Sequence, residues 1–308
     1  MSLSRRDLIA LTPAAVAATA MSKSSAAEPS EPFGYSFNTS TIRGQKVPVN
    51  EEARMAAKAG YNAFEPWIAE LQEYAKKGGN LKDLGKEIAD LGLKVESSIG
   101  FARWIVDDDL ERQKGLDDAK RDMEMVLAIG GVRIAAPPAG ATDKPIKDLG
   151  VITDRYRTLA ELGAKIGVIP EAEVWGFSKT LSRLGETVLV AMESGHPKAC
   201  VLPDIYHLYK GGSGFDGLKL LQGKTIGIFH VNDYPKDKDR AVIKDADRVY
   251  PGEGVAPLKD VFRTLRDIGY RGMISLELFN PEYYKQDAFE VVKTGLAKTK
   301  AAVRAALA

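Results

Sequence analysis

From residue 33 onward the chain repeats one unit, in which an amphipathic helical stretch ends at a glycine and an apolar segment follows within about two residues. Glycine readily adopts the left-handed backbone conformation that closes a helix, so each such glycine predicts a joint from a helix to a strand. The predicted joints are Gly60, Gly92, Gly130, Gly167 and Gly269. The repeat therefore predicts strands and helices in alternation.

Eight apolar segments are the predicted strands. They are FGYSFNTS near residue 35, YNAFEPW after Gly60, LKVESSIGF after Gly92, GVRIAAPP after Gly130, VIPEAEVWG after Gly167, KACVLPDIYH near residue 202, TIGIFHVND near residue 228 and YRGMISLELF after Gly269. Most are continuous apolar runs, which indicates parallel strands buried on both faces. Eight strand–helix units in about 270 residues predict an α/β fold, a single (β/α)8 TIM barrel over residues 33–308. A doubly wound open sheet is the alternative, but no G-x-G-x-x-G follows the first predicted strand.

Residues 1–27 have the pattern of a twin-arginine-type signal peptide. Arg5 and Arg6 precede the short apolar stretch LIALTPAAVAATA, and the small residues SAA at 25–27 are typical of a cleavage site. The stretch is too short and too rich in alanine to span a bilayer stably. We therefore expect a periplasmic or secreted protein, with residues 28–32 as a linker. A disordered or helical N-terminal arm is the alternative.

Composition restricts the classes of binding partner and of reaction that the sequence predicts. The chain has 43 basic and 42 acidic residues, whereas a nucleic-acid enzyme would be expected to carry a basic excess. Cys200 is the single cysteine, so an internal disulfide framework is excluded. No serine stands in a G-x-S-x-G setting, which argues against a serine hydrolase, and no dinucleotide fingerprint points to hydride transfer.

Ionisable residues stand at the ends of four consecutive predicted strands, where TIM barrels have their active sites. They are Glu173, Asp204, His230 and Glu277. A lone charge beside an apolar run would be costly to bury, so we expect the four to converge on one cation. Carboxylates with one imidazole suit a divalent metal, Mn²⁺ in first place, with Mg²⁺, Co²⁺ or Zn²⁺ as alternatives. The chain has three histidines, and two of them, His207 and His230, fall at strand ends.

Four segments carry a resemblance to a known family: PDIYHLYKGG, FHVNDYP, RVYPGEGVAPL and ISLELF. The chain resembles the xylose isomerase-like TIM barrels, which include sugar and sugar-phosphate isomerases and epimerases, and endonuclease IV. In D-tagatose 3-epimerase-like members, two acids, a histidine and a late glutamate bind one metal. The resemblance places these residues here in that order: Glu173, Asp204, His230 and Glu277. Glu171, on the same strand face as Glu173, is the alternative for the first ligand.

Further residues are candidates for contact with a small carbohydrate substrate. The resemblance implies that His207 and Arg248 hold substrate oxygens. Glu65, in FEPW at the end of the second predicted strand, is a candidate for binding a substrate hydroxyl, with a structural salt bridge as the alternative. Trp175 is a candidate for stacking on a sugar ring, although core packing would explain an aromatic residue equally well.

The two glutamates of the predicted metal set suggest a reaction. Glu173 and Glu277 stand on the fifth and eighth predicted strands, so we expect them on opposite sides of the metal. A metal beside a carbonyl favours loss of the α-proton, which one carboxylate takes and another group returns. Removal of a proton from one face of a carbon and return of a proton to its other face is epimerisation. A single carboxylate that shuttles the proton on one face gives aldose–ketose isomerisation. The sequence thus predicts a sugar isomerase or epimerase without choosing between them.

Three alternatives accompany this prediction. A 3-keto-glycoside lyase or hydratase, or a dehydratase, would form the same enolate and expel a group from the β-carbon, and export favours it slightly because glycosides occur outside the cell. An endonuclease IV-like nuclease is disfavoured, because the three histidines here are too few for the three-zinc site that this resemblance implies. A non-catalytic sugar-binding module is disfavoured by the complete ligand set. The sequence leaves open which sugar or glycoside is bound, the metal's identity and the oligomeric state, including a homo-oligomer.

Overall fold

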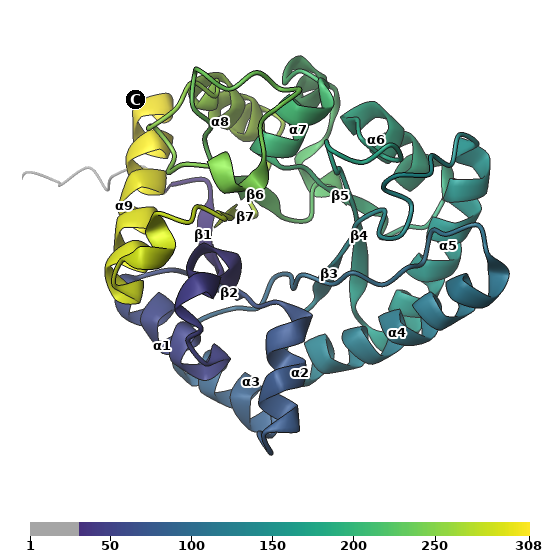
Figure 1. Cartoon of the computed structure of the whole chain (residues 1–308), viewed down its shortest axis with the longest axis horizontal. Coiled ribbons are helices and arrows are strands. Elements are labelled where there is room, and N and C mark those ends of the chain that lie inside the picture. Colours follow the sequence, from purple (N-terminus) through teal and green to yellow (C-terminus); the bar gives the residue numbers. More distant parts are fainter. Residues whose placement is uncertain (1–30) are drawn as a thin grey trace, which may run out of the picture. The chain divides into compact units, whose positions relative to one another are not determined.

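The computed structural model describes residues 31–308 (Figure 1), so the predicted signal peptide and residues 28–30 of the predicted linker lie outside the described residues. The strands are β1 (Gly34–Asn38), β2 (Ala63–Glu65), β3 (Arg133–Ala136), β4 (Ile169–Glu173), β5 (Cys200–Leu202), β6 (Phe229–Val231) and β7 (Met273–Leu276). The α-helices are α1 (Val49–Ala59), α2 (Ile68–Lys76), α3 (Leu81–Asp90), α4 (Asp109–Ala128), α5 (Leu149–Ile166), α6 (Leu184–Glu193), α7 (Ile205–Gly211), α8 (Leu258–Asp267) and α9 (Ala288–Leu307). Short 3₁₀ helices lie at Thr39–Gln45, Asp216–Leu220, Gly223–Thr225, Asp245–Asp247 and Tyr283–Lys285.

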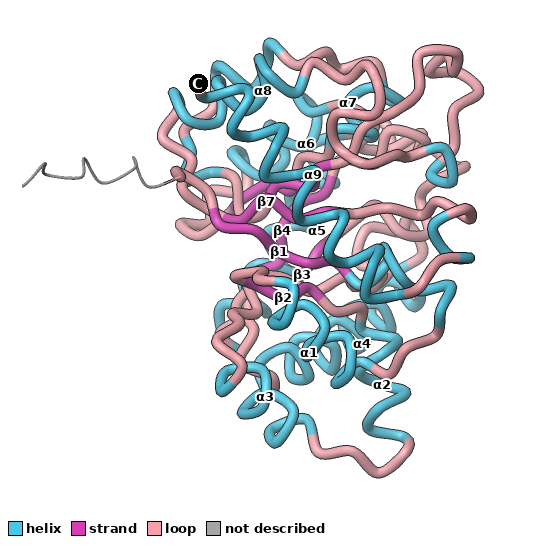
Figure 2. Tube along the Cα trace, turned by 90° about the vertical axis from the view of Figure 1, so that its left-hand side faces the viewer, coloured by secondary structure: helices cyan, strands magenta, loops and turns pink. Residues whose placement is uncertain are grey.

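All strand pairs are parallel, as predicted, and form two sheets with the orders β2-β1-β7-β6 and β3-β4-β5. Isolated parallel bridges join β5 to the segment around β6, at Val201 with Ile226 and at Asp204 with His230. The strands lie at the centre and the helices surround them (Figures 1 and 2). This arrangement brings the carboxyl ends of strands that are far apart in sequence to one end of the sheets.

The third predicted strand, LKVESSIGF, is not a regular strand in the structure. It contacts the β2 segment through two bridges, Ala63 with Lys94 and Trp67 with Ile99, and Ala135 N–H donates to the Ser98 carbonyl at 2.9 Å. Between the two bridges the β2 segment advances four residues, from Ala63 to Trp67, whereas the third segment advances five, from Lys94 to Ile99. The third segment therefore has one extra residue, which interrupts the ladder as in a β-bulge. Pro66 lies inside the same stretch and has no N–H to donate. The prediction of eight regular strands is therefore wrong at this segment.

The five predicted helix-to-strand joints are confirmed by backbone conformation. Their glycines, Gly60, Gly92, Gly130, Gly167 and Gly269, have φ values between 78° and 101°. At the first joint, the Gly60 N–H donates to the carbonyls of Ala56 and Ala57, which closes α1 just before β2. A residue with a Cβ would be strained in this conformation.

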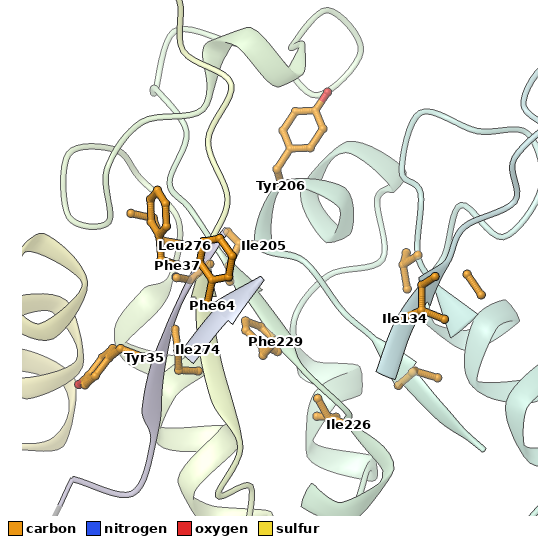
Figure 3. Packing of buried hydrophobic residues seen from close by; sticks show 14 of the residues in the cluster. Tyr35, Phe37, Phe64, Ile134, Ile205, Tyr206, Ile226, Phe229, Ile274 and Leu276 are labelled. Carbon is orange, nitrogen blue, oxygen red and sulfur yellow. The ribbon is translucent and has the colours of Figure 1, made fainter. Parts of the chain in front are cut away.

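The main apolar core lies between the strands and the helices. Figure 3 shows part of it, with Phe37 of β1, Phe64 of β2, Phe229 of β6 and Ile274 of β7, and all four side chains are fully buried. Burying a side chain of this size stabilises the folded chain by about 1.5–3 kcal/mol relative to leaving it in water. These contacts hold the strands in place. They therefore also fix the positions of the strand residues whose side chains point away from the helices.

The opposite strand face carries buried polar residues as well as a small apolar cluster of Ile99, Ala135, Leu202 and Ile228. In β6, Phe229 and Val231 belong to the main core, so His230 between them points to the opposite side. His230 pairs in register with Ser275 of β7, and Asn38 of β1 pairs with Glu65 of β2. All four of these polar residues are fully buried. The strands therefore enclose a polar layer, in which each charge needs a partner.

No helix within residues 31–308 is long and apolar enough to cross a membrane.

Glycine also permits a close backbone approach at Gly223, and this gives a stability prediction. A Cβ at Gly223 would collide with backbone atoms of Gly269 and Tyr270, whereas a Cβ at Gly185, within α6, would have no atom within 4 Å. Gly223→Ala should lower the free energy of unfolding by about 1–3 kcal/mol, because backbone must shift. Gly185→Ala is the matched control and should be neutral or stabilise by up to about 1 kcal/mol. Thermal unfolding checks both, and equal midpoints would contradict the packing described.

Candidate active site

The predicted ligands converge from consecutive strands. Glu173 ends β4, Asp204 follows β5 and caps the N-terminus of α7, His230 is the middle residue of β6, and Glu277 follows β7. Asp204 and His230 are fully buried, and each of the two glutamates is 4% exposed. Inward-pointing strand positions and the bridge between Asp204 and His230 bring these groups together.

Asp204, His230 and Glu277 form a compact donor group. One ligand atom from each lies within 4.8 Å of those from the other two. His230 Nδ1 lies 3.3 Å from Glu277 Oε2 and 4.0 Å from Asp204 Oδ2. Among the described residues, this nitrogen has no hydrogen-bond partner with acceptable geometry. An unpaired imidazole nitrogen facing two carboxylates has the chemistry of a metal site.

Glu65 contacts Nε2, the other nitrogen of this imidazole. His230 Nε2 lies 3.1 Å from both Glu65 oxygens, so a proton on Nε2 is donated to that carboxylate. In the neutral tautomer that carries its proton there, Nδ1 has a lone pair to offer a metal. Glu65 also accepts from the Ser275 hydroxyl at 2.6 Å. Glu65 is fully buried, and it does not line the cavity that Glu173, Glu277 and Arg248 border. The sequence left Glu65 open between binding a substrate hydroxyl and forming a structural salt bridge, and its contact with His230 agrees with the salt bridge. In this position Glu65 orients the imidazole ring.

Glu173 lines the same cavity, but it is not part of the compact donor group found within residues 31–308. Its Oε2 atom is buried and has no hydrogen-bond partner in that part of the chain. Burial raises the pKa of Glu173 well above its ordinary value, and the nearby Glu277 charge raises it further. The alternative ligand Glu171 accepts from Ile228 N–H at 3.3 Å and lies 3.6 Å from Arg133 Nε. Of these two acids, only Glu173 lines the cavity.

Arg248 supplies a buried positive charge to the site. Its Nη1 lies 3.1 Å from Asp204 Oδ2 and 2.8 Å from Glu277 Oε2. The guanidinium group is 1% exposed and stacks on Tyr206 at 4.4 Å. Burial by itself would raise the pKa of Glu277, but the charges of His230 and Arg248 outweigh it and lower that pKa to about 2. Burial raises the pKa of Asp204, and the charge of Arg248 opposes this rise.

His207 lies beside Arg248 at the cavity wall. Its Nε2 is 3.3 Å from Arg248 Nη2, and its Nδ1 accepts from the Gly176 N–H at 3.3 Å. Burial lowers the pKa of His207 well below its ordinary value, and the Arg248 charge lowers it further. The ring is therefore neutral near pH 7 and able to hydrogen-bond a substrate oxygen.

A cavity of about 240 Å³ connects these groups to the surface. Its lining residues are Trp67, Ile99, Phe101, Glu173, Trp175, Phe177, His207, Asp245, Arg248, Glu277 and Phe279. The structure thus brings together the predicted substrate-contacting residues His207, Arg248 and Trp175 with Glu173 and Glu277. A larger hollow of about 450 Å³ beside α6, with Leu184, Val188 and Leu220 in its wall, contains none of the predicted site residues.

Asn38 is a site residue that the sequence analysis missed. Its Nδ2 donates to Glu65 Oε2 at 2.9 Å and to Glu277 Oε1 at 3.3 Å. Its Oδ1 accepts from Trp67 Nε1 at 3.1 Å. Asn38 ends β1, so the criterion of polar residues at strand ends would have found it, but that criterion was applied to ionisable residues only. Asn232 is similar, because its amide donates to Asp204 Oδ2 at 2.9 Å.

Comparison with known proteins gives a family and named relatives. The family model described as xylose isomerase-like TIM barrel matches residues 53–301. An inosose isomerase of Bacillus velezensis is 27% identical over 275 residues, which cover 87% of this chain and 96% of that protein. A fructoselysine 3-epimerase of Escherichia coli O157:H7 is 25% identical over 81% of this chain and 94% of the relative.

Two other similarities bear on the chemistry and the fold. A 3-dehydroshikimate dehydratase of Pseudomonas putida is 23% identical over 75% of this chain but only 36% of its own length. A crystal structure described as the IOLI protein with a binding zinc atom superposes with a TM-score of 0.82 at 24% identity, over 89% of this chain and 99% of that one. This structural likeness shows the fold, and the bound zinc belongs to that protein.

The network around Asn38 predicts its effect on metal binding. Asn38→Ala should weaken Mn²⁺ binding about 10- to 100-fold, the usual effect of removing a residue that orients metal ligands, because Glu65 and Glu277 lose a shared donor. Equilibrium dialysis measures the affinity. Ser36→Ala is the matched control, since Ser36 is buried on the same strand and its hydroxyl has no hydrogen-bond partner among residues 31–308. Unchanged affinity in the Asn38 variant would contradict the positioning role.

Proposed function

Because the chain belongs to the xylose isomerase-like TIM-barrel family, we propose that it is a divalent-metal-dependent isomerase or epimerase acting on a carbohydrate. The observation that carries this proposal is the buried group of Asp204, His230 and Glu277 beside a cavity whose lining includes the carboxylates of Glu173 and Glu277. The relatives named inosose isomerase and fructoselysine 3-epimerase support a substrate of this class.

The residues present fit a divalent metal. His230 Nδ1 and Glu173 Oε2 are buried atoms with no hydrogen-bond partner among the described residues, and Asp204 and Glu277 bring further carboxylate oxygens close to that nitrogen. We assign Glu173, Asp204, His230 and Glu277 as the ligands, and Mn²⁺ as the ion, with Mg²⁺, Co²⁺ and Zn²⁺ as alternatives that such donors also accept. When bound, the ion polarises a substrate carbonyl and makes the neighbouring C–H bond more acidic.

The chain's own residues then move the proton. Glu173 and Glu277 line the cavity from β4 and β7, which belong to different sheets. In this mechanism one carboxylate takes the proton next to the carbonyl, and the other returns one. Return to the opposite face of the same carbon inverts it, which is epimerisation, whereas return to the neighbouring carbon by a single shuttling group is isomerisation. His207 and Arg248 hold substrate oxygens, and Trp175 packs against the ring.

A dehydratase is the second candidate, supported by the relative named 3-dehydroshikimate dehydratase. The same proton is removed, and a leaving group on the β-carbon then departs with the electron pair of the broken bond. A 3-keto-glycoside lyase or hydratase would use the same step with the aglycone as leaving group. Product analysis distinguishes these reactions from isomerisation, because only they release water or an aglycone.

Metal content tests the ligand assignment. Purified protein that is loaded with Mn²⁺ and then dialysed should retain about one ion per chain. Asp204→Ala and His230→Ala should each lose most of it, because each removes a donor from the buried group. Asp216→Ala, an exposed acid on a distant 3₁₀ helix, is the control and should retain the wild-type amount. Full metal retention by either ligand variant would overturn the assignment.

Solvent deuterium tests the reaction. The Mn²⁺-loaded enzyme is incubated in D₂O with a panel of cyclic and open-chain hydroxyketones, including an inosose. We expect NMR to show deuterium on the carbon next to the carbonyl of the substrate that is turned over. Glu277→Gln should reduce turnover about 10²-fold or more, the usual scale for losing a general base. Turnover that is unaffected by both Glu277→Gln and Glu173→Gln, with full retention of substrate hydrogen, would exclude the carboxylate mechanism.

A further inference from the structure

Five aromatic side chains form a band in the cavity wall. We call Trp67, Phe101, Trp175, Phe177 and Phe279 the aromatic band. Phe101 ends the irregular third segment, the other four follow β2, β4 and β7, and all five line the same cavity. Neighbouring rings are in contact, with centroids 5.1 Å apart for Trp67 and Phe101, 5.9 Å for Phe101 and Trp175, and 4.9 Å for Trp175 and Phe177. Phe279 joins the band through Trp67 at 5.9 Å.

The cavity changes from polar to apolar toward its opening. The polar lining residues Glu173, Glu277 and Arg248 are 4%, 4% and 1% exposed, whereas Phe101 and Phe177 are 41% and 40% exposed. Three charged groups are thus at the buried end, and phenylalanine rings are at the end that faces solvent. Asp245 is the partly exposed charged residue of the lining, with its side chain 39% exposed, and it is ion-paired with Arg248. An exposed apolar surface that continues a binding cavity is typical of a ligand contact.

The band offers a sugar few hydrogen bonds. Of the two indole N–H groups in the band, that of Trp67 already donates to Asn38 Oδ1 at 3.1 Å. The phenylalanine rings have no polar atoms. A fully hydroxylated ring that filled the outer part of the cavity would therefore lose water from its hydroxyl groups without replacement, which is unfavourable.

We propose that the substrate carries an apolar or aromatic substituent, which packs on the aromatic band while the hydroxylated ketone end lies among the buried polar groups. Phe101 and Phe177 are the residues that select for this substituent. The proposal rests on the proposed function only for the statement that the buried end is the end that reacts. A bare monosaccharide or cyclic polyol would leave both phenylalanine rings exposed.

Matched ligands test the band without requiring turnover. Calorimetry compares phenyl and methyl β-glycosides of glucose, galactose and mannose, which lack the ketone, on the Mn²⁺-loaded protein. We expect at least one phenyl glycoside to bind about 10-fold or more tightly than its methyl counterpart, which corresponds to about 1.4 kcal/mol. This ratio should fall toward one in Phe101→Ala and Phe177→Ala. Leu220→Ala removes a side chain that is 90% exposed outside this cavity, so it should keep the wild-type ratio.

Several results would overturn the inference. Equal binding of phenyl and methyl glycosides, or no measurable binding of any, excludes selection by the band. A wild-type dimer that Phe101→Ala or Phe177→Ala converts to monomers would instead assign the exposed rings to contact with a second copy of the chain. Solvent deuterium exchange by the wild-type enzyme separates this inference from the proposed function. Deuterium exchange without a preference for phenyl glycosides would reject only the apolar substituent. A preference for phenyl glycosides without deuterium exchange would reject only the proposed reaction.

Discussion

Burial of negative charge is the constraint on which the site depends. Asp204, Glu173 and Glu277 are withdrawn from water at the ends of neighbouring strands. Mutual repulsion and desolvation disfavour three ionised carboxylates in so small a volume. Arg248 compensates part of this charge by contacting two of the three acids, and His230 Nδ1 faces the same two acids. A bound divalent cation would supply the remaining positive charge, so the arrangement that is costly to fold also favours the binding of a cation.

Strand register provides the support for this arrangement. Asn38 and Glu65 are paired residues on β1 and β2, and Ser275 of β7 pairs with His230 of β6. Hydrogen bonds then connect these positions across four strands of one sheet. Each polar residue of this buried layer restricts its neighbours, which fixes the imidazole orientation without a flexible loop. Such rigid support is what a metal ligand requires, because small displacements weaken coordination.

The loops that follow the strands form a different part of the cavity from the polar residues on the strands. Trp175 and Phe177 follow β4, Phe279 follows β7, and all three line the cavity. They determine the shape and polarity of the outer part of the cavity, above the buried polar groups. This division is compatible with a family whose named relatives include isomerases, epimerases and a dehydratase, since different loops on one scaffold permit different substrates and reactions.

The sequence by itself determined the parallel α/β architecture, the five glycine joints and the family, because periodicity, left-handed glycines and strand-end motifs are local signals. It also placed Asp204, His230 and Glu277 at one end of the sheets. Only the tertiary structure decided that the third segment forms a bulged, irregular strand, that Glu65 faces His230, and that Asn38 contacts Glu277. These contacts join residues up to 239 positions apart, and they depend on strand register and on which neighbour fills each space. No local pattern encodes such distances, so side-chain partners follow from packing alone.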